Sequence, residues 1–135
     1  MIFGALHHVE LRVCDLAAAK ESWGWLLTRL GYGVFQDWPD GMSWRLGETY
    51  LVVEQVESSE SHDRRGSGLS HLAFHAGTAD RVDAIAAAAP EHGWSLLYPD
   101  RRPWAGGPPG AGFAGHYAAY FENAERFKIE LVAGA

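Results

Sequence analysis

Apolar and polar residues alternate in the same way in two segments that are far apart in the chain. The first segment reads LHHVELRV at residues 6–13, and the second reads LSHLAFHA at 69–76. Alternation of this kind predicts a β-strand with one buried face. Aligning the two segments places His71 on His8. We therefore expect two equivalent strands, each projecting a histidine in the same way, as an internal duplication would produce.

The same order of elements follows each of these two strands. Asp15 can cap a helix over residues 16–30, and Thr78 can cap a helix over 79–89. Alternating segments bounded by turn residues then predict further strands. They lie near 32–37, 42–47 and 50–56 in the first half and near 94–98, 116–122 and 127–133 in the second. Each half is thus predicted to fold as a strand, a helix and three strands, which gives a mixed α+β fold.

The two halves are residues 1–60 and 61–135, and the second half is the longer one. Its additional residues lie in the segment 99–115, which is rich in glycine and proline. Such a composition ends helices and central strands and predicts a long loop. Two roles are open for this loop, a solvated insertion and a lid over a site.

Composition narrows the range of functions. The chain has 135 residues, 47% of them hydrophobic and 21% charged, and no apolar run near the roughly 20 residues that a membrane-spanning helix needs. Its net charge of −6 comes without a basic stripe, so neither a membrane nor a nucleic acid is an expected partner. Cys14 is the single cysteine, which excludes an internal disulfide. No signal-peptide pattern is visible, and we expect a cytoplasmic protein.

The last strands of the two halves superpose as well. YLVVEQV at 50–56 aligns with RFKIELV at 126–132, so that Glu54 falls on Glu130. In the second of these segments the apolar residues alternate with Lys128 and Glu130, which places Glu130 on the face away from the packing side. A carboxylate among apolar neighbours is costly to desolvate unless a cation or hydrogen-bond donors meet it. A bound metal ion would meet that need.

Two imidazoles and one carboxylate at matched positions of a repeat are a typical set of metal ligands. His8, His71 and Glu130 are therefore predicted to bind a divalent metal ion together. Glu54 has two interpretations, a fourth ligand and an ordinary solvated residue at a strand exit. The neighbour of His8, His7, is expected to point the other way as a structural or surface residue.

Further polar and aromatic residues are candidates for catalysis or for substrate binding. His75 shares a strand face with His71 and is a candidate partner of a metal ligand. The candidate acid–base groups, which can equally be ordinary strand residues, are His116, Tyr117 and Tyr120. The tryptophans that can either stack on a flat aromatic ligand or anchor the core and loops are Trp38, Trp44, Trp94 and Trp104.

Three segments together resemble the vicinal oxygen chelate superfamily, which includes glyoxalase I, extradiol dioxygenases, fosfomycin-resistance proteins and bleomycin-binding proteins. The segments are HHVELRVCDL at 7–16, GLSHLAF at 68–74 and HYAAYFENAERFKIELVA at 116–133. The resemblance covers nearly the whole chain. It implies two βαβββ modules whose eight strands form a partly open, barrel-like sheet around a metal cavity.

The resemblance also implies roles for single residues. The metal ligands of the family would fall on His8, His71 and Glu130, and the remaining first-module ligand of glyoxalase I would fall on Glu54. Arg12 would correspond to the arginine that holds a carboxylate of glutathione. The family's DPDG turn before the last strand is replaced by NAER at 123–126, and little else resembles a glutathione site.

Two function classes follow from the resemblance. In the first, the chain is a metal-dependent enzyme that chelates neighbouring substrate oxygens to a divalent Ni, Zn, Fe, Mn or Co ion. Glu130 or Glu54 would be the base of a glyoxalase-type lyase or isomerase, while a dioxygenase would use open positions on iron. In the second, the chain sequesters an aromatic drug or metabolite without chemistry, as the bleomycin resistance proteins do. A small-molecule ligand and a homodimer, in some relatives with exchanged modules, are expected in either class.

Overall fold

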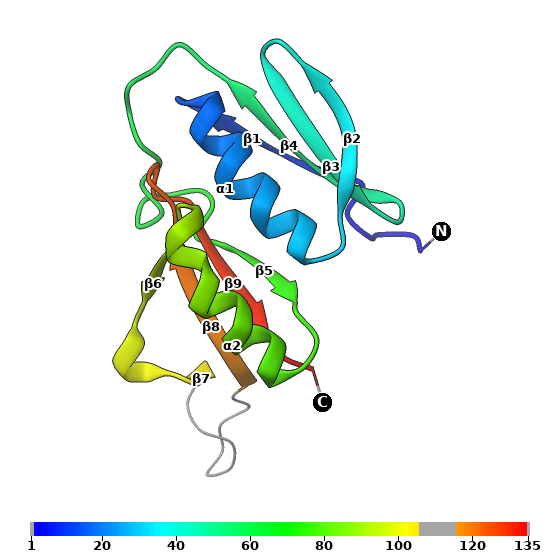
Figure 1. Ribbon diagram of the computed structural model, residues 1–135. Helices are drawn as coiled ribbons and strands as arrows, with labels where there is room; N and C mark the ends of the chain where they lie inside the picture. Colours follow the sequence, from blue (N-terminus) through cyan, green and yellow to red (C-terminus); the bar gives the residue numbers. More distant parts are fainter. Residues whose placement is uncertain (1, 106–115, 135) are drawn as a thin grey trace. The chain divides into compact units, whose positions relative to one another are not determined.

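The chain divides into two compact units, Met1–Ser61 and His62–Ala135. A computed structural model of the chain is drawn in Figure 1. The structure describes residues 2–105 and 116–134. Each unit contains one mixed sheet with one long helix packed on one of its faces (Figure 1).

The first unit is built on a four-stranded sheet in the order β1-β4-β3-β2. Strands β1 and β4 are parallel, and the other neighbours are antiparallel. Its elements in chain order are β1 (His8–Val13), α1 (Leu16–Arg29), β2 (Gly33–Trp38), β3 (Gly41–Leu46) and β4 (Thr49–Gln55). Helix α1 begins as the sequence predicts, because the Asp15 side chain accepts a hydrogen bond from the backbone N–H of Ala18 at 3.1 Å.

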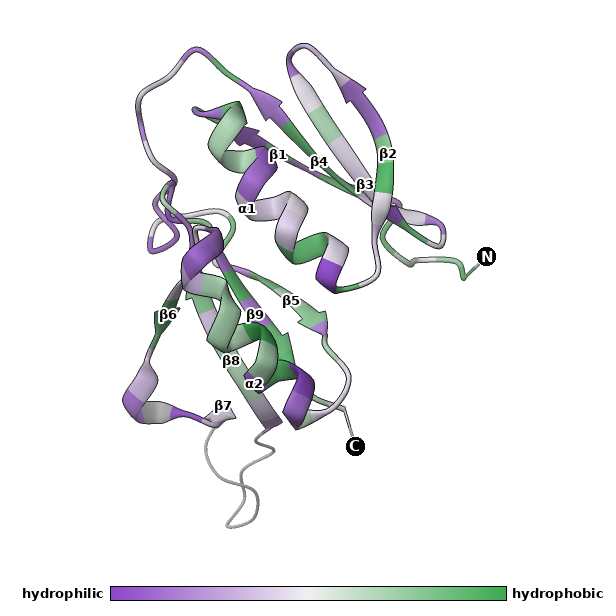
Figure 2. Cartoon of the chain, in the orientation of Figure 1, coloured by the Kyte–Doolittle hydropathy of each residue, from purple (hydrophilic) through white to green (hydrophobic). Residues whose placement is uncertain are grey.

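The core of the first unit lies between α1 and the sheet. Period-two alternation along β1 buries Leu11 and Val13 and leaves His8, Glu10 and Arg12 exposed on the other face, as predicted. Coloured by hydropathy, the strands of this sheet and helix α1 show green and purple or pale residues in turn along their length (Figure 2). The residues of α1 that complete this core are Ala19, Ser22, Trp23, Leu26 and Leu27.

The second unit is built on the sheet order β5-β9-β8-β6, with β7 paired to β8. Its strands are β5 (Leu72–His75), β6 (Ser95–Leu97), β7 (Trp104–Ala105), β8 (His116–Glu122) and β9 (Lys128–Val132). Its helices are α2 (Ala79–Ala88) and the short 3-10 helices η1 (Ala89–His92) and η2 (Pro99–Arg101). The Thr78 hydroxyl accepts from the backbone N–H of Arg81 at 3.2 Å and caps α2. Val82 and Ile85 of α2 pack into the core of this unit.

Each predicted helix and strand corresponds to an element of the structure, with ends that differ by at most three residues. The single, partly open, eight-stranded barrel-like sheet stays a prediction. The described residues contain nine strands, because Trp104–Ala105 adds the short strand β7 inside the segment predicted as a loop. The fold is α+β, with sheets of four and five strands. The lid proposed for 99–115 falls largely on residues 106–115, which lie outside the described residues.

Among the residues that the structure describes, no helix has the length and apolar character needed to cross a membrane. The homodimer and the cytoplasmic location that we expect from the sequence stay predictions.

Candidate functional site

The centre of the candidate site is Glu130, on strand β9 of the second unit. Its neighbours Ile129 and Leu131 are fully buried in the core, so the carboxylate of Glu130 points to the other face of the sheet. Glu130 is nevertheless only 4% exposed. A carboxylate that is buried to this degree needs positive charge or hydrogen-bond donors at both of its oxygens.

Two histidines meet the two carboxylate oxygens of Glu130. Nε2 of His71 lies 3.2 Å from Oε1, and Nε2 of His116 lies 2.5 Å from Oε2. His71 comes directly before β5, and His116 is the first residue of β8, so three segments of the chain converge on one carboxylate. The structure thus brings together two predicted metal ligands and one predicted acid–base group.

The hydroxyl of Ser70 lies 3.0 Å from the other ring nitrogen of His71, Nδ1. A contact to the second nitrogen fixes the orientation of an imidazole ring, and metal-binding histidines typically have one. Ser70 therefore holds Nε2 of His71 in place toward Glu130.

The two contacts of Glu130 differ in a way that matters for metal binding. Two ligands of one ion, each about 2.1 Å from it and 90° to 109° apart, lie roughly 3.0 to 3.4 Å from each other. The distance of 3.2 Å between His71 Nε2 and Glu130 Oε1 falls in this range. The 2.5 Å between His116 Nε2 and Oε2 is too short for it and is that of a hydrogen bond from His116 to the carboxylate. The donor set fits a divalent ion held by His71 and Glu130, with His116 as an outer partner.

Tyr120 completes the surroundings of Glu130. It is the direct cross-strand partner of Glu130, and its ring centroid lies 5.6 Å from that of His71. Burial and the adjacent Glu130 carboxylate raise the pKa of Tyr120 to about 12. Tyr120 is therefore a neutral phenol at physiological pH, able to donate a hydrogen bond.

Lys128 and Tyr98 flank Tyr120 on the same face, and the sequence analysis missed both as site residues. The Lys128 ammonium lies 4.8 Å from the ring centroids of Tyr98 and of Tyr120 and donates a hydrogen bond to the Tyr98 hydroxyl at 3.0 Å. This ammonium lowers the pKa of the Tyr98 phenol. The period of two along β9 places Lys128 beside Glu130, but nothing in the sequence places Tyr98 there.

In the first unit, His8 has a local environment that matches that of His71. Its Nδ1 lies 2.8 Å from Nδ1 of His7, so the preceding residue contacts Nδ1 in both repeats. The ring of His8 also stacks on Tyr50, with centroids 4.8 Å apart and an interplanar angle of 5°. The prediction that His7 points away from His8 is wrong, because the chain is not yet in a regular strand at His7 and its ring also contacts Tyr50.

The strand register does not support Glu54 as the counterpart of Glu130. In the second unit Glu130 pairs with Ala73, two residues after His71. In the first unit Glu54 pairs with Arg12, four residues after His8 and roughly 13 Å along the strand from it. Val52 occupies the position that corresponds to Glu130. We therefore leave Glu54 out of the ligand set.

Two of the candidate ligand-stacking tryptophans are core residues. Trp44 and Trp94 are each 1% exposed. Trp44 points toward α1, where Gly24 leaves room for its indole, because a β-carbon at that glycine would lie 3.4 Å from the ring. The proposal that Trp44 binds substrate is therefore wrong. Trp38 is half-buried over Gly41, and its role stays a prediction.

Tyr117 lies on the opposite face of β8 from His116 and Tyr120. Its hydroxyl donates to the Asp83 carboxylate of α2 at 2.8 Å, which Arg102 also contacts at 2.6 Å. Trp104 packs edge-on against Tyr117, with ring centroids 5.6 Å apart. The structure thus separates Tyr117 and Trp104 from the Glu130 cluster and gives them a structural role. Exposed positions that nothing here joins to the cluster are Arg12 and His75.

The Asp83 contacts lead to a prediction about stability. The hydrogen bond from Tyr117 and then that from Arg102 lower the pKa of Asp83, so their contribution is complete above the ordinary value of 3.8 and is lost as the pH falls through the lowered pKa. Because Asp83 is half-exposed, Asp83→Asn should reduce the free energy of unfolding by only about 1 kcal/mol at pH 7. Urea unfolding at pH 7, 5 and 3.5 checks this. A deficit that stays constant over the whole pH range would contradict the assignment.

No three His, Cys, Asp or Glu side chains within residues 2–105 and 116–134 are arranged as a complete metal site. Within the second unit, His71 and Glu130 therefore provide two ligand positions. That His8 is a further ligand stays a prediction from the sequence.

Comparison with known proteins places the chain in a family. The family model described as the Glyoxalase/Bleomycin resistance protein/Dioxygenase superfamily matches residues 7–120. The chain belongs to this superfamily. The resemblance to vicinal oxygen chelate proteins that the sequence motifs indicate is confirmed.

Relatives within and around the superfamily agree with this placement. The uncharacterised protein YqjT of Bacillus subtilis is 42% identical over 131 residues, which cover 95% of this chain and 98% of YqjT. A crystal structure of a candidate glyoxalase from Bacillus halodurans has a TM-score of 0.88 and 42% identity, over 98% of this chain and 97% of that one. A fosfomycin resistance protein of Listeria monocytogenes, crystallised with Mn(II) and a dihydroxypropylphosphonic acid, shares the fold, with a TM-score of 0.66 and 19% identity over 100% and 93% of the chains.

Proposed function

We propose that this superfamily member is a metal-dependent enzyme for a small-molecule substrate, with His71 and Glu130 as ligands of a divalent ion. One observation carries the proposal: Glu130 is 4% exposed, and an imidazole nitrogen faces each of its oxygens. The fosfomycin resistance relative that was crystallised with Mn(II) supports the choice of a divalent ion.

The ion, when bound, would supply Lewis acidity to two neighbouring oxygens of a substrate. The chain's own residues then have separate tasks. Ser70 orients His71, and His116 donates to Oε2 of Glu130, which leaves Oε1 directed toward His71. Tyr120 stays protonated, and its hydroxyl is hydrogen-bonded to the carboxylate of Glu130. Isomerase or lyase chemistry and dioxygenase chemistry are both compatible with these tasks.

The alternative function is a binding protein that holds an aromatic ligand without chemistry. Two of the four tryptophans on which that interpretation rested, Trp44 and Trp94, are buried in the core. A buried carboxylate between two imidazoles has no evident use in an aromatic trap. The geometry therefore favours the enzyme.

The test is turnover by the full chain, stripped with EDTA and reloaded separately with Mn(II), Ni(II), Zn(II), Co(II) or Fe(II). Candidate substrates are the hemithioacetal of methylglyoxal and glutathione for isomerisation, and catechol with oxygen for dioxygenation. We expect metal-dependent turnover in one of these classes, and a loss of at least about 100-fold in His71→Ala. His92→Ala, a histidine in η1, is the matched control and should retain activity. No metal bound after reloading, together with no turnover with any ion, would contradict the enzyme.

A further inference from the structure

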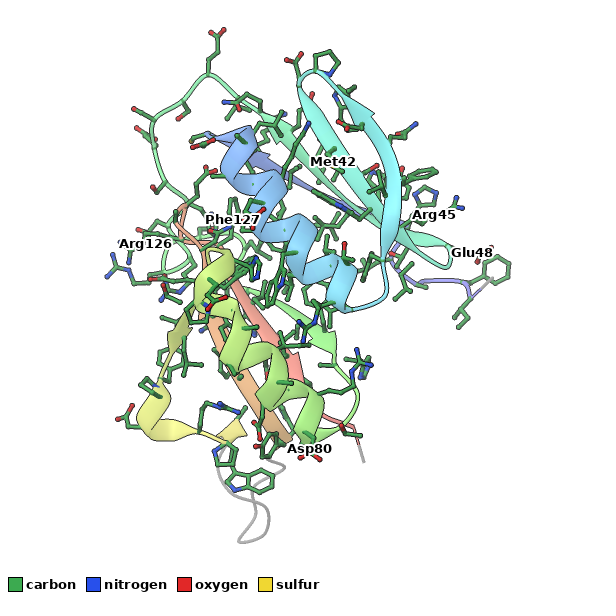
Figure 3. The ribbon with its side chains drawn as sticks, in the orientation of Figure 1. Met42, Arg45, Glu48, Asp80, Arg126 and Phe127 are labelled. Atoms are coloured by element: carbon green, nitrogen blue, oxygen red, sulfur yellow. The ribbon has the colours of Figure 1, made fainter. Side chains whose placement is uncertain are left out.

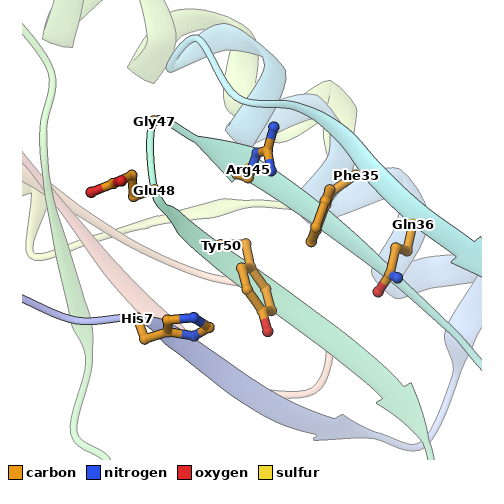
Figure 4. A pocket seen from close by; sticks show the side chains of 7 residues that line it. All are labelled: His7, Phe35, Gln36, Arg45, Gly47, Glu48 and Tyr50. Carbon is orange, nitrogen blue, oxygen red and sulfur yellow. The ribbon is translucent and has the colours of Figure 1, made fainter. Parts of the chain in front are cut away.

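The first unit contains a pocket of about 560 Å³ on the face of its sheet that α1 does not cover (Figure 4). The pocket is lined by residues of β2, β3 and β4, of the segment before β1, and of the turn after β3, which contributes Gly47 and Glu48. Those that define its chemistry are His7, Phe35, Gln36, Arg45 and Tyr50. His71 and Glu130, the metal ligands proposed above, are not among these residues, whereas His8, a ligand predicted from the sequence, contacts His7 and stacks on Tyr50 beside the pocket.

An irregularity in β2 builds one wall of this pocket. Consecutive residues of a regular strand point to opposite faces of the sheet, yet both Phe35 and Gln36 line the pocket. The register explains this, because Val34 pairs with Trp44 and Gln36 pairs with Ser43, which leaves Phe35 as an extra residue in a bulge. The bulge turns the Phe35 ring onto the same face as Arg45.

Aromatic rings form a continuous surface across the sheet beside the bulge. The centroids of Phe35 and Tyr50 are 5.2 Å apart, and those of His7 and Tyr50 are 5.4 Å apart. Phe35 is 39% exposed although it is a large apolar side chain. A planar ligand that covered these rings would remove apolar surface from water.

Arg45 gives the aromatic surface a positive end. It pairs directly with Tyr50 across β3 and β4, and its guanidinium lies 4.6 Å from the centroid of the Phe35 ring. Among the described residues no acidic side chain forms an ion pair with Arg45, whose contact is this ring face. Glu48, in the turn after β3, directs its carboxylate away from the guanidinium (Figures 3 and 4). The guanidinium can therefore accept a planar anion in a two-point interaction.

We propose that this pocket binds a planar aromatic carboxylate, with the ring of the ligand on Phe35 and Tyr50 and its carboxylate on Arg45. Both halves of such a ligand are needed. The ring matches the aromatic surface formed by His7, Phe35 and Tyr50, and the carboxylate matches a guanidinium held in position over Phe35.

The experiment compares 2-naphthoate with 2-naphthamide, which has the same ring system and no charge. Binding to the full chain, kept metal-free with EDTA, is measured by isothermal titration calorimetry. We expect 2-naphthoate to bind at least tenfold more tightly than 2-naphthamide. Inorganic phosphate should not compete at equal concentration, because it lacks the ring.

Matched variants place the effect at the pocket. Arg45→Met keeps most of the side-chain stem, removes the charge, and should weaken 2-naphthoate at least tenfold while leaving 2-naphthamide unchanged. Arg29→Met is the control. Arg29 is also an exposed arginine of the first unit, and its guanidinium lies 5.5 Å from the centroid of the Trp25 ring. It should bind both compounds like the original chain. Phe35→Leu should weaken both compounds, because it removes the ring and not the charge.

Three results would overturn the proposal: equal affinity for the two compounds, an equal loss in Arg45→Met and Arg29→Met, or full displacement of 2-naphthoate by phosphate. Because no metal is present in this experiment, a negative result here leaves the metal proposal unaffected, and the converse also holds.

Discussion

Replacing Glu130 by glutamine is expected to weaken the binding of Mn(II) or Zn(II) to the full chain by at least roughly 100-fold. Glutamine has nearly the same size and can still accept a hydrogen bond from His116, so the fold should be retained. It lacks the negative charge with which the carboxylate of Glu130 would bind the ion. Isothermal titration calorimetry of the apoprotein with each metal measures the effect.

The distances around Glu130 also predict a rank order. His116→Ala removes an outer partner of Glu130 and should lower metal affinity roughly 10- to 100-fold. His71→Ala removes a proposed ligand and should lower metal affinity further. Glu91→Gln, at an exposed glutamate of the same unit, is the charge-matched control and should leave affinity unchanged. The assignment fails if Glu130→Gln binds metal as tightly as this control.

Trp44→Ala is expected to reduce the free energy of unfolding by about 3 to 5 kcal/mol. Trp44 is 1% exposed, and its indole fills the space that Gly24 leaves on α1, so truncation creates a cavity that neighbouring backbone cannot close. This loss is a large fraction of the total stability of a typical domain. Chemical denaturation followed by far-UV circular dichroism measures it.

A second tryptophan supplies the control. Trp104 is 39% exposed, and Trp104→Ala should cost no more than about 1 kcal/mol, because it loses mainly the edge-on contact with Tyr117. If Trp44→Ala does not fold, Trp44→Phe keeps part of the buried volume and should cost roughly 1 to 2 kcal/mol. Equal costs for Trp44→Ala and Trp104→Ala would mean that Trp44 is not a core residue.

The sequence predicted the elements of this fold well because its local signals agree. Asp15 and Thr78 are good helix caps, and both accept the expected backbone hydrogen bonds. Alternation along β1 and β9 identified the buried and polar faces, including that of Glu130. In β3 the sequence GMSWRL does not alternate in hydropathy, so the burial of Trp44 was not readable from it.

The site was predicted only where the repeat and the period of two were sufficient. The repeat and the period of two correctly predicted that His71 and Glu130 lie together. The period of two also places His116 and Tyr120 on the opposite face of β8 from Tyr117, but this difference was not used in the prediction. Glu54 was misplaced because strand register depends on the turns between strands, and an alignment of motifs does not contain that information. Tyr98 could not be found, since its place beside Lys128 arises from packing between distant segments.

The most direct test of the account is a crystal structure of the full chain soaked with Zn(II), with anomalous difference maps recorded on both sides of the zinc absorption edge. The account predicts a zinc peak about 2.0 to 2.2 Å from Nε2 of His71 and from a carboxylate oxygen of Glu130, with His116 still hydrogen-bonded to the other oxygen. Fully occupied zinc bound only at other residues, or an unchanged direct contact between His71 and Glu130 at saturating zinc, would contradict it.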